Sequence, residues 1–227
     1  MTLPKKTALL VGASGLVGSF CLRLLLQTDW YANVIVVGRK ALPIEHPKLR
    51  QLVIDFDKLD TYKDSLIADD VYCTLGTTIS KAGSRDNFYK VDYTYVVKLA
   101  AITSANFASQ FLVVSAMGAN PDSSFFYNRV KGQMENTVKP MPFLGVHIFQ
   151  PSLLLGPRPE KRFGESIAAF FMTKLDFLFT GKLKKYKAIP AEDVAKAMLY
   201  AAMQEGAGIK IHDSDTIRQE AALLKLS

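Results

Sequence analysis

Three glycines, Gly12, Gly15 and Gly18, have the spacing of a phosphate-binding turn. They follow the apolar segment 7–11 and precede a segment with helical apolar spacing at 20–26. A strand, a glycine turn and a helix in this order are typical of a dinucleotide site, where helix amides face a pyrophosphate. The spacing is Gly-x-x-Gly-x-x-Gly rather than the Gly-x-Gly-x-x-Gly of the usual fingerprint. On this motif alone, a glycine-rich turn without a ligand remains the alternative.

A second group of residues suited to chemistry consists of Ser115, Tyr127 and Lys131. Ser115 ends the apolar run 111–115, and ligands of doubly wound sheets bind outside the carboxyl ends of the strands. Tyr127 and Lys131 are four residues apart, so on a helix their side chains share one face and can point at the same ligand. The alternatives are an ordinary strand-ending turn at Ser115 and a half-exposed helix face without chemistry at 127–131.

The residues after the second apolar run, 33–37, bear on whether the protein would bind NAD(H) or NADP(H). About 20 residues past the glycine turn, a fold that binds NAD usually places an acidic residue on the ribose 2′-hydroxyl. This chain has Arg39 and Lys40 there, and a guanidinium can bind a 2′-phosphate through two hydrogen bonds. The sequence therefore predicts NADP(H) as the cofactor, unless Arg39 and Lys40 form only a solvated strand end.

Alternating strand and helix patterns must position these residues. Short apolar runs typical of strands buried on both faces lie at 7–11, 33–37, 51–55, 70–74, 111–115 and 145–149, and 209–212 is a candidate for a last strand. Apolar residues recur at helical spacing from Phe88 onward, whereas the polar segment 80–86 predicts a loop. This order predicts an α/β fold of the Rossmann type, with a doubly wound parallel sheet.

We expect residues 1–227 to form a single NAD(P)-binding domain, in which 157–190 is a small substrate-covering appendage. Within it, the Phe-rich segment 163–179 precedes the basic run 182–187. These segments fit either a substrate-covering helix with a solvated turn or an amphipathic contact with a membrane or a partner. We favour the first interpretation.

Length and composition are those of an ordinary globular protein, with 227 residues, 49% of them hydrophobic. The net charge of +7 suits an anionic dinucleotide, and no stretch interleaves aromatic and basic residues as a nucleic-acid surface would. Cys21 and Cys73 are too few for a disulfide framework, and the three histidines lack metal-ligand spacing. We therefore expect no nucleic-acid partner and no metal. Because no apolar run is long enough to predict a transmembrane helix, we expect a cytoplasmic protein.

Several segments resemble the short-chain dehydrogenase/reductase superfamily. More narrowly, they are similar to its atypical group of Tat-interacting-protein-like NAD(P)-binding oxidoreductases. The resemblance spans roughly residues 5 to 160 and rests on the glycine turn with the segments 53–60, 72–78, 81–83 and 130–132. The chain departs from many extended members at Asp92, where they carry asparagine. That departure leaves open the role of this asparagine in a proton relay or a helix kink.

The resemblance implies hydride transfer between NADP(H) and a small carbonyl or alcohol substrate. Tyr127 would be the acid/base, because a cation one helical turn away moves the ordinary tyrosine pKa of about 10 toward the working range. Lys131 would supply that cation and bind the nicotinamide ribose, and Ser115 would hold the substrate oxygen. Two other functions remain open: a regulatory or scaffold protein whose NADPH occupancy controls a protein partner, and an isomerase or epimerase. A monomer and a homodimer both fit.

The resemblance also assigns contacts along the cofactor. The pyrophosphate would lie against Gly12, Ser14, Gly15, Leu16, Val17 and Gly18, and the nicotinamide carboxamide against Gln150, Pro151, Ser152 and Leu153. Asp55 and Phe56 would contact the adenine, and Leu75 and Gly76, with Thr77 next to them, would flank its ribose. As an alternative, Asp55 could cap the segment that follows it.

Overall fold

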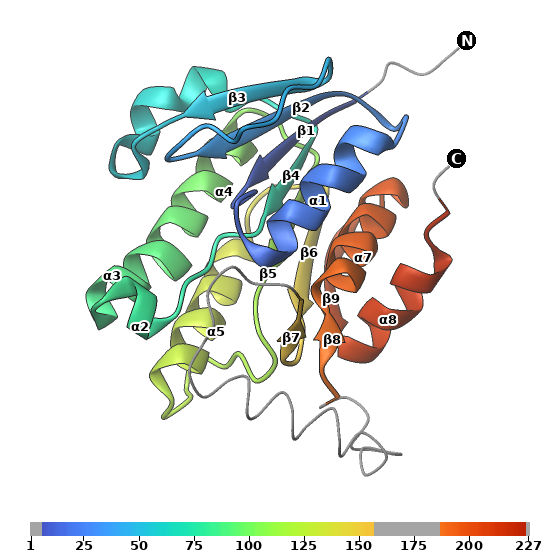
Figure 1. The fold of residues 1–227 in the computed structure, drawn as a ribbon. Helices are drawn as coiled ribbons and strands as arrows, with labels where there is room; N and C mark the ends of the chain where they lie inside the picture. The colour runs from blue at the N-terminus through green and yellow to red at the C-terminus, as the bar shows by residue number, and fades with distance from the viewer. Residues whose placement is uncertain (1–5, 157–186, 226–227) are drawn as a thin grey trace.

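Seven parallel strands form the central sheet of the protein, in the order β3-β2-β1-β4-β5-β6-β9 (Figure 1). They belong to a computed structural model that describes residues 6–156 and 187–225. The strands are β1 (Lys6–Val11), β2 (Tyr31–Gly38), β3 (Leu49–Val53), β4 (Asp70–Cys73), β5 (Gln110–Val114), β6 (Gly145–Gln150) and β9 (Gly208–Asp213). The strands β2 and β3 lie on one side of β1. The chain then returns, so that β4 pairs with the other side of β1. In sheets of this topology the ligand crevice lies outside the carboxyl ends of the strands at the point of reversal, which here is between β1 and β4.

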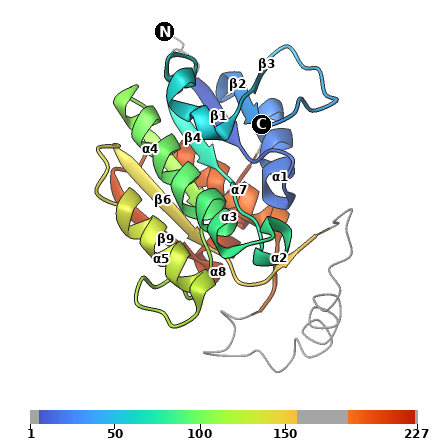
Figure 2. The same cartoon turned by 90° about the vertical axis from the view of Figure 1, so that its left-hand side faces the viewer.

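Helices cover both faces of this sheet (Figure 2). One face carries α1 (Leu16–Gln27), α7 (Ala191–Met203) and α8 (Ser214–Leu223). The other face carries the 3-10 segment η1 (Phe56–Ser65), α4 (Tyr95–Ala105) and α5 (Phe126–Val138). Consecutive residues of β1 alternate between the two apolar cores: Leu10 belongs to the first, and Leu9 to the second. Both faces are therefore buried, which explains why these strands are almost continuously apolar.

The predicted Rossmann-type sheet is confirmed, and most of its strands lie within two residues of their expected positions. The third strand ends at Val53 instead of residue 55, because Asp55 caps η1. The expected loop at 80–86 is wrong. The segment contains α2 (Ile79–Ala82) and the beginning of α3 (Arg85–Tyr89), which Thr78 and Ser84 cap with side-chain hydrogen bonds. A π-helical turn, η2 (Lys90–Thr94), then joins α3 to α4.

The expected appendage at 157–190 lies almost wholly outside the described residues, including the segment 163–179. Its last residues contain β8 (Ile189–Pro190), which pairs in parallel with β7 (Leu154–Leu155). This two-stranded sheet connects the end of β6 to the beginning of α7.

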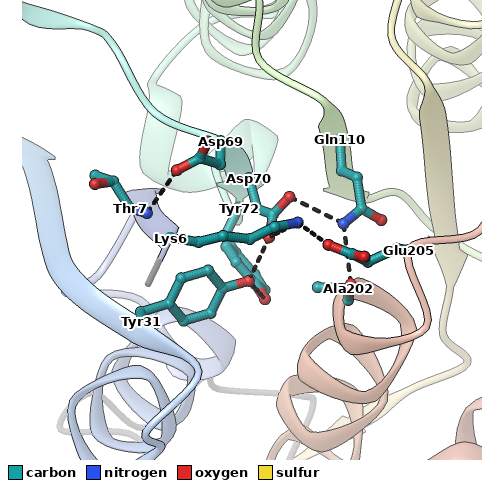
Figure 3. A network of polar contacts seen from close by, with 9 residues as sticks. All are labelled: Lys6, Thr7, Tyr31, Asp69, Asp70, Tyr72, Gln110, Ala202 and Glu205. Atoms are coloured by element: carbon teal, nitrogen blue, oxygen red, sulfur yellow. Dashed lines mark hydrogen bonds and ion pairs between the residues drawn. The ribbon is translucent and has the colours of Figure 1, made fainter. Parts of the chain in front are cut away.

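At the amino ends of the strands, a buried polar network joins the sheet to α7 (Figure 3). The Asp70 carboxylate accepts hydrogen bonds from the Tyr31 hydroxyl at 2.8 Å and from the Gln110 amide at 2.9 Å. Gln110 also donates to a backbone carbonyl of α7, and Lys6 forms ion pairs with Asp70 and Glu205. Burial raises the pKa of Asp70 even though the Tyr31 and Lys6 contacts oppose that rise. The network fixes the edge of the sheet that lies opposite the ligand crevice.

Candidate cofactor and active site

The structure brings the loop segments that we expected to contact a dinucleotide, together with Ser115, to one edge of the sheet. Each follows, or ends, one of six adjacent strands. In the order of the sheet these are Asp55 and Phe56 after β3, Arg39 and Lys40 after β2, residues 12–18 after β1, residues 75–77 after β4, Ser115 after β5, and residues 150–153 at the end of β6. Because parallel strands all end at the same edge, this collection follows directly from the sheet.

The turn after β1 requires glycine at two positions. Gly12 has a φ of +89°, and a Cβ atom there would lie 2.7 Å from the Thr74 carbonyl oxygen. A Cβ on Gly18 would lie 2.1 Å from the Gly12 carbonyl oxygen. The Gly15 amide closes the turn on that same oxygen at 2.9 Å, and Gly15 provides no side-chain cap for α1. The amides that begin α1 therefore face the crevice with the partial positive charge of a helix N-terminus.

The edge beyond β2 combines two cations with a carboxylate. Arg39 and Lys40 are exposed, and the register of β2 and β3 places Gly38 opposite Val53. The Asp55 carboxylate accepts the Asp57 amide at 3.0 Å and so caps η1, which is the alternative that we left open. Phe56 is buried against Tyr95. Adenine contacts by Asp55 and Phe56 stay predictions.

Tyr127 and Lys131 lie on the same helix, α5, but in different environments. Tyr127 is 36% exposed, and its ring packs against the buried Phe88 with ring centres 5.5 Å apart. Lys131, one turn further along, is only 3% exposed and interacts electrostatically with Tyr127. The helix therefore presents a partly open phenol next to a buried cation, which is the arrangement that acid–base chemistry by a tyrosine requires.

The buried cation has a counter-ion that we did not predict. The Lys131 ammonium lies 2.8 Å from the Asp92 carboxylate, which comes from η2. The other Asp92 oxygen accepts the Thr77 amide at 2.9 Å. Burial lowers the pKa of Lys131, but the attraction of Asp92 and then of Tyr127 more than offsets it, so that the pKa is raised. Asp92 thus joins the residues after β4 to α5.

Ser115 also has an unpredicted partner on α5. Its hydroxyl donates a hydrogen bond of 2.5 Å to Glu135, a carboxylate that is 2% exposed. The Gln150 amide donates to both Glu135 oxygens at 2.9 and 3.0 Å. Glu135 lies one turn beyond Lys131, so its spacing from Tyr127 and Lys131 was a signal that could have found it. The substrate contact of Ser115 stays a prediction.

The segment after Gln150 is tied to the rest of the protein through its own groups. The Pro151 carbonyl accepts the Met117 amide at 3.0 Å. The Ser152 amide donates to the Ser214 hydroxyl at 2.8 Å, and the Ser152 hydroxyl donates to the Lys187 carbonyl. These bonds fix the segment at the end of β6, where the carboxamide contact stays a prediction.

A histidine of β6 and a histidine of β9, to which we assigned no role from the sequence, form a buried pair. His147 and His212 are both buried, and their ring nitrogens are 3.0 Å apart. The second nitrogen of His212 lies 2.8 Å from the Glu220 carboxylate on α8. Burial, then His212 and Lys210, lower the pKa of His147 to about 4. The pair joins neighbouring strands β6 and β9, which only the sheet register could reveal.

Two further features concern membranes and metals. Within residues 6–156 and 187–225, no helix has the length and apolar character to span a membrane. The same residues contain no group of three or more His, Cys, Asp or Glu side chains placed to bind a metal ion. Cys21 and Cys73 are both free and buried, and burial raises the pKa of the Cys73 thiol to about 12.

Comparison with known proteins identifies close relatives. The chain is 36% identical to the protein HTATIP2 of Rattus norvegicus over 207 residues, which cover 89% of this chain and 84% of the relative. It is 30% identical to the protein FMP52, mitochondrial, of Candida albicans over 226 residues, or 96% of each chain. No protein-family model matches the chain.

Solved structures with the same fold include proteins in complex with NAD. The Bordetella bronchiseptica enzyme WbmH, in complex with NAD+, aligns over 96% of this chain and 80% of its own, with a TM-score of 0.70 and 16% identity. MoeE5, in complex with UDP-glucose and NAD, aligns over 97% of this chain and 82% of its own, with a TM-score of 0.67 and 17% identity. At these identities the likeness shows the fold alone.

The relatives contradict the cytoplasmic location that we expected. Several FMP52 proteins, including those of Aspergillus clavatus and Candida albicans, are named mitochondrial. Our expectation rested on the absence of a long apolar run. Such an absence concerns only membrane-spanning helices, so it gives no information on the compartment in which a protein folds.

Proposed function

The chain belongs to the family of HTATIP2 and FMP52 proteins, which are atypical short-chain dehydrogenase/reductases, and we propose that it is an NADP(H)-dependent oxidoreductase. Its substrate would be a small carbonyl compound or the corresponding alcohol. The observation that carries this proposal is the pairing of Tyr127 with the buried Lys131 cation on one helix at the ligand edge of the sheet.

The residues at this edge fit a dinucleotide. Gly12 and Gly18 leave no space for a Cβ, so the turn packs tightly against Thr74 and α1 begins directly at the turn. The backbone amides at the beginning of α1 would then bind a pyrophosphate. A Cβ on Gly76 would lie 3.9 Å from the Lys131 ammonium, so the strip after β4 runs directly past that cation. Lys131 would donate to the nicotinamide ribose hydroxyls from this position. The complexes of WbmH and MoeE5 with NAD support a nicotinamide dinucleotide as the ligand of this fold.

Arg39 and Lys40 support NADP(H) rather than NAD(H). Both are exposed directly after β2, at the position where the ribose of the adenosine lies in this fold. A guanidinium can form two charge-assisted hydrogen bonds with a 2′-phosphate, and Lys40 adds a second cation. Asp55 follows the neighbouring strand β3. Its negative charge opposes the binding of a 2′-phosphate, but it leaves the hydrogen-bond donors of Arg39 and Lys40 in place.

The chemistry would be a proton transfer coupled to a hydride transfer. Bound NADPH supplies a hydride to a carbonyl carbon. The Tyr127 hydroxyl would donate its proton to the carbonyl oxygen as the alcohol forms, and it would take that proton back in the oxidation direction. The Lys131 cation stabilises the phenolate that remains, in a site where burial strengthens the interaction. Phe88 holds the Tyr127 ring in place while part of it stays exposed to a substrate.

The proposal is tested by the oxidation of NADPH over a panel of aldehydes and ketones, with the wild type and Tyr127→Phe. We expect the variant to lose a factor of about 100 to 10,000 in turnover while it still binds NADPH. Tyr89→Phe is a matched control, because it removes a hydroxyl from another helix and should leave turnover unchanged. Equal turnover by the wild type and Tyr127→Phe on every substrate would overturn the assignment.

The same experiment separates two other functions. Epimerisation would use the same residues, so the panel includes UDP-sugars, which several proteins of this fold bind. A regulatory protein would bind NADPH tightly, turn over no substrate, and change its affinity for a protein partner with cofactor occupancy. A pull-down that is identical with and without NADPH would count against that regulatory function.

A further inference from the structure

Asp92 and Lys131 form an ion pair that is almost completely withdrawn from water. Their side chains are 1% and 3% exposed, and the carboxylate and ammonium are 2.8 Å apart. Among the described residues, four groups from different elements interact with Lys131: Asp92 from η2, Tyr127 from α5, the Cys73 thiol from β4, and the Val114 carbonyl at 3.5 Å from β5. Cys73 is held in its neutral form by burial. Within residues 6–156 and 187–225, Asp92 is therefore the carboxylate that forms an ion pair with this ammonium.

A buried ammonium without a counter-ion readily loses its proton. Burial alone can bring the pKa of a lysine down to about 5 or 6, because the charged form loses its hydration. Burial is also the largest single influence on Lys131, and it acts to lower the pKa. The pKa is nevertheless raised, chiefly through the attraction of Asp92. A neutral amine could not stabilise a phenolate, so the charge of Lys131 matters for the reaction and is not guaranteed by its residue type.

The fold places Asp92 in this role through the irregular turn η2. The helix that begins at α3 widens to a π-helical turn at Lys90–Thr94 before it continues as α4. Such turns rotate the side chains within them relative to a regular helix, and they are frequent at functional sites. Here the turn contains Asp92, whose two oxygens contact the Lys131 ammonium and the Thr77 amide. An asparagine could accept the Thr77 bond, but it would carry no charge.

We propose that Asp92 is a positioning residue that keeps the buried Lys131 ammonium charged and so enables Tyr127 to act. The proposal rests on the function proposed above, since only a reacting tyrosine needs the cation. It assigns a purpose to an acidic residue at a position where, by the resemblance described above, many extended members of the superfamily carry asparagine. Asp92 itself contacts no reacting atom; it acts through Lys131.

The direct test follows the ammonium of Lys131 without cofactor or substrate. Protein with ¹³C-labelled lysine is titrated by NMR, and the Lys131 signal is identified by its absence from Lys131→Met. In Asp92→Asn the midpoint of this signal should fall by about two pH units or more, because burial is no longer balanced. Asp60→Asn is the matched control, since it removes the same charge from an exposed pair with Lys98 and should leave the Lys131 signal in place. An unchanged Lys131 midpoint in Asp92→Asn would overturn the proposal.

Kinetics test the consequence for the reaction. The kcat of Asp92→Asn should fall about tenfold relative to the wild type one pH unit above the variant's own Lys131 midpoint, where about nine tenths of that lysine is neutral, and much less at pH 6. A loss that is equal at both pH values would indicate a merely structural role and contradict the proposal. If the wild type turns over no substrate, the proposed oxidoreductase function fails, whereas the NMR titration still decides whether Asp92 controls the charge of Lys131.

If Asp92→Asn does not fold, a comparison of the thermal stabilities of two other variants still tests the proposal. Lys131→Met leaves a buried carboxylate without its cation, which is strongly unfavourable. The double variant Asp92→Asn/Lys131→Met removes both charges and should unfold several degrees above Lys131→Met. Equal or lower thermal stability of the double variant would show that the two charges are not coupled, and would overturn the proposal.

Discussion

The Ser115 hydroxyl donates a hydrogen bond to Glu135, which lies on the same helix as Tyr127 and Lys131. Glu135 also accepts two hydrogen bonds from the Gln150 amide, so one buried carboxylate joins the ends of β5 and β6 to α5. A hydroxyl that donates to a carboxylate presents only its lone pairs to any other group. The contact therefore bears directly on what Ser115 can do for a substrate.

We expect Ser115→Ala to affect stability more than catalysis. The variant leaves the buried Glu135 with one donor fewer, which should reduce the free energy of unfolding by about 1–3 kcal/mol. Turnover should fall less than tenfold. Urea denaturation and NADPH-linked kinetics measure the two effects, with the exposed Ser124→Ala as control. A loss of a hundredfold in kcat at unchanged stability would instead favour the substrate contact that the family resemblance implies.

Gly18→Ala should damage both the fold and cofactor binding. The added Cβ would lie 2.1 Å from the Gly12 carbonyl oxygen, so α1 must move away from the turn. Overpacking of this kind costs about 1–3 kcal/mol, and the displaced helix would no longer present its amides to a pyrophosphate. Thermal unfolding and NADPH titration by fluorescence test this, and Ser19→Ala, at an exposed position on the same helix, should be almost neutral. Wild-type NADPH affinity in Gly18→Ala would contradict the pyrophosphate assignment.

Arg39→Ala should weaken the binding of NADPH selectively. Loss of charge-assisted hydrogen bonds worth about 1.5–3 kcal/mol corresponds to a decrease in affinity of roughly tenfold to a hundredfold. NADH lacks the 2′-phosphate, so its dissociation constant should not change. Calorimetric titration with both nucleotides gives the comparison, with Arg50→Ala on β3 as a matched control. Equal losses of affinity for NADPH and NADH would show that Arg39 does not bind the 2′-phosphate.

The stability of the protein should fall in mild acid because of His147. Its folded pKa of about 4 lies below the ordinary value of 6.5, so between these values the unfolded chain binds a proton that the folded protein does not. The contribution of neutral His147 to the free energy of unfolding is fully present above pH 6.5. It decreases by about 3 kcal/mol as the pH falls toward 4. Denaturation at several pH values should show a flatter dependence for His147→Gln than for the wild type. His46→Gln, outside the buried pair, should retain the wild-type slope, and a retained slope in His147→Gln would refute the assignment.

Local patterns in the sequence were sufficient for the sheet and for the glycine turn. The strands are apolar on both faces because helices cover both, so their runs could be recognised without knowledge of their neighbours. Gly12 and Gly18 owe their importance to backbone conformation and to contacts inside one strand–turn–helix unit. The shared face of Tyr127 and Lys131 follows from the period of a helix. The loop expected at 80–86 was wrong because polar residues also cap and begin short helices, as Thr78 and Ser84 do.

The sequence by itself thus determined the Rossmann-type sheet, the edge at which we propose that a dinucleotide binds, and the spacing of the residues proposed to act there. Tertiary structure alone decided which buried polar and charged groups contact one another. The contacts Asp92–Lys131, Ser115–Glu135 and His147–His212 each join different elements of the fold. No local periodicity encodes such contacts, because they depend on the order of the strands, the packing of helices on them, and one widened helical turn at Lys90–Thr94. Burial then gives each pair its electrostatic strength, and burial is a property of the whole fold.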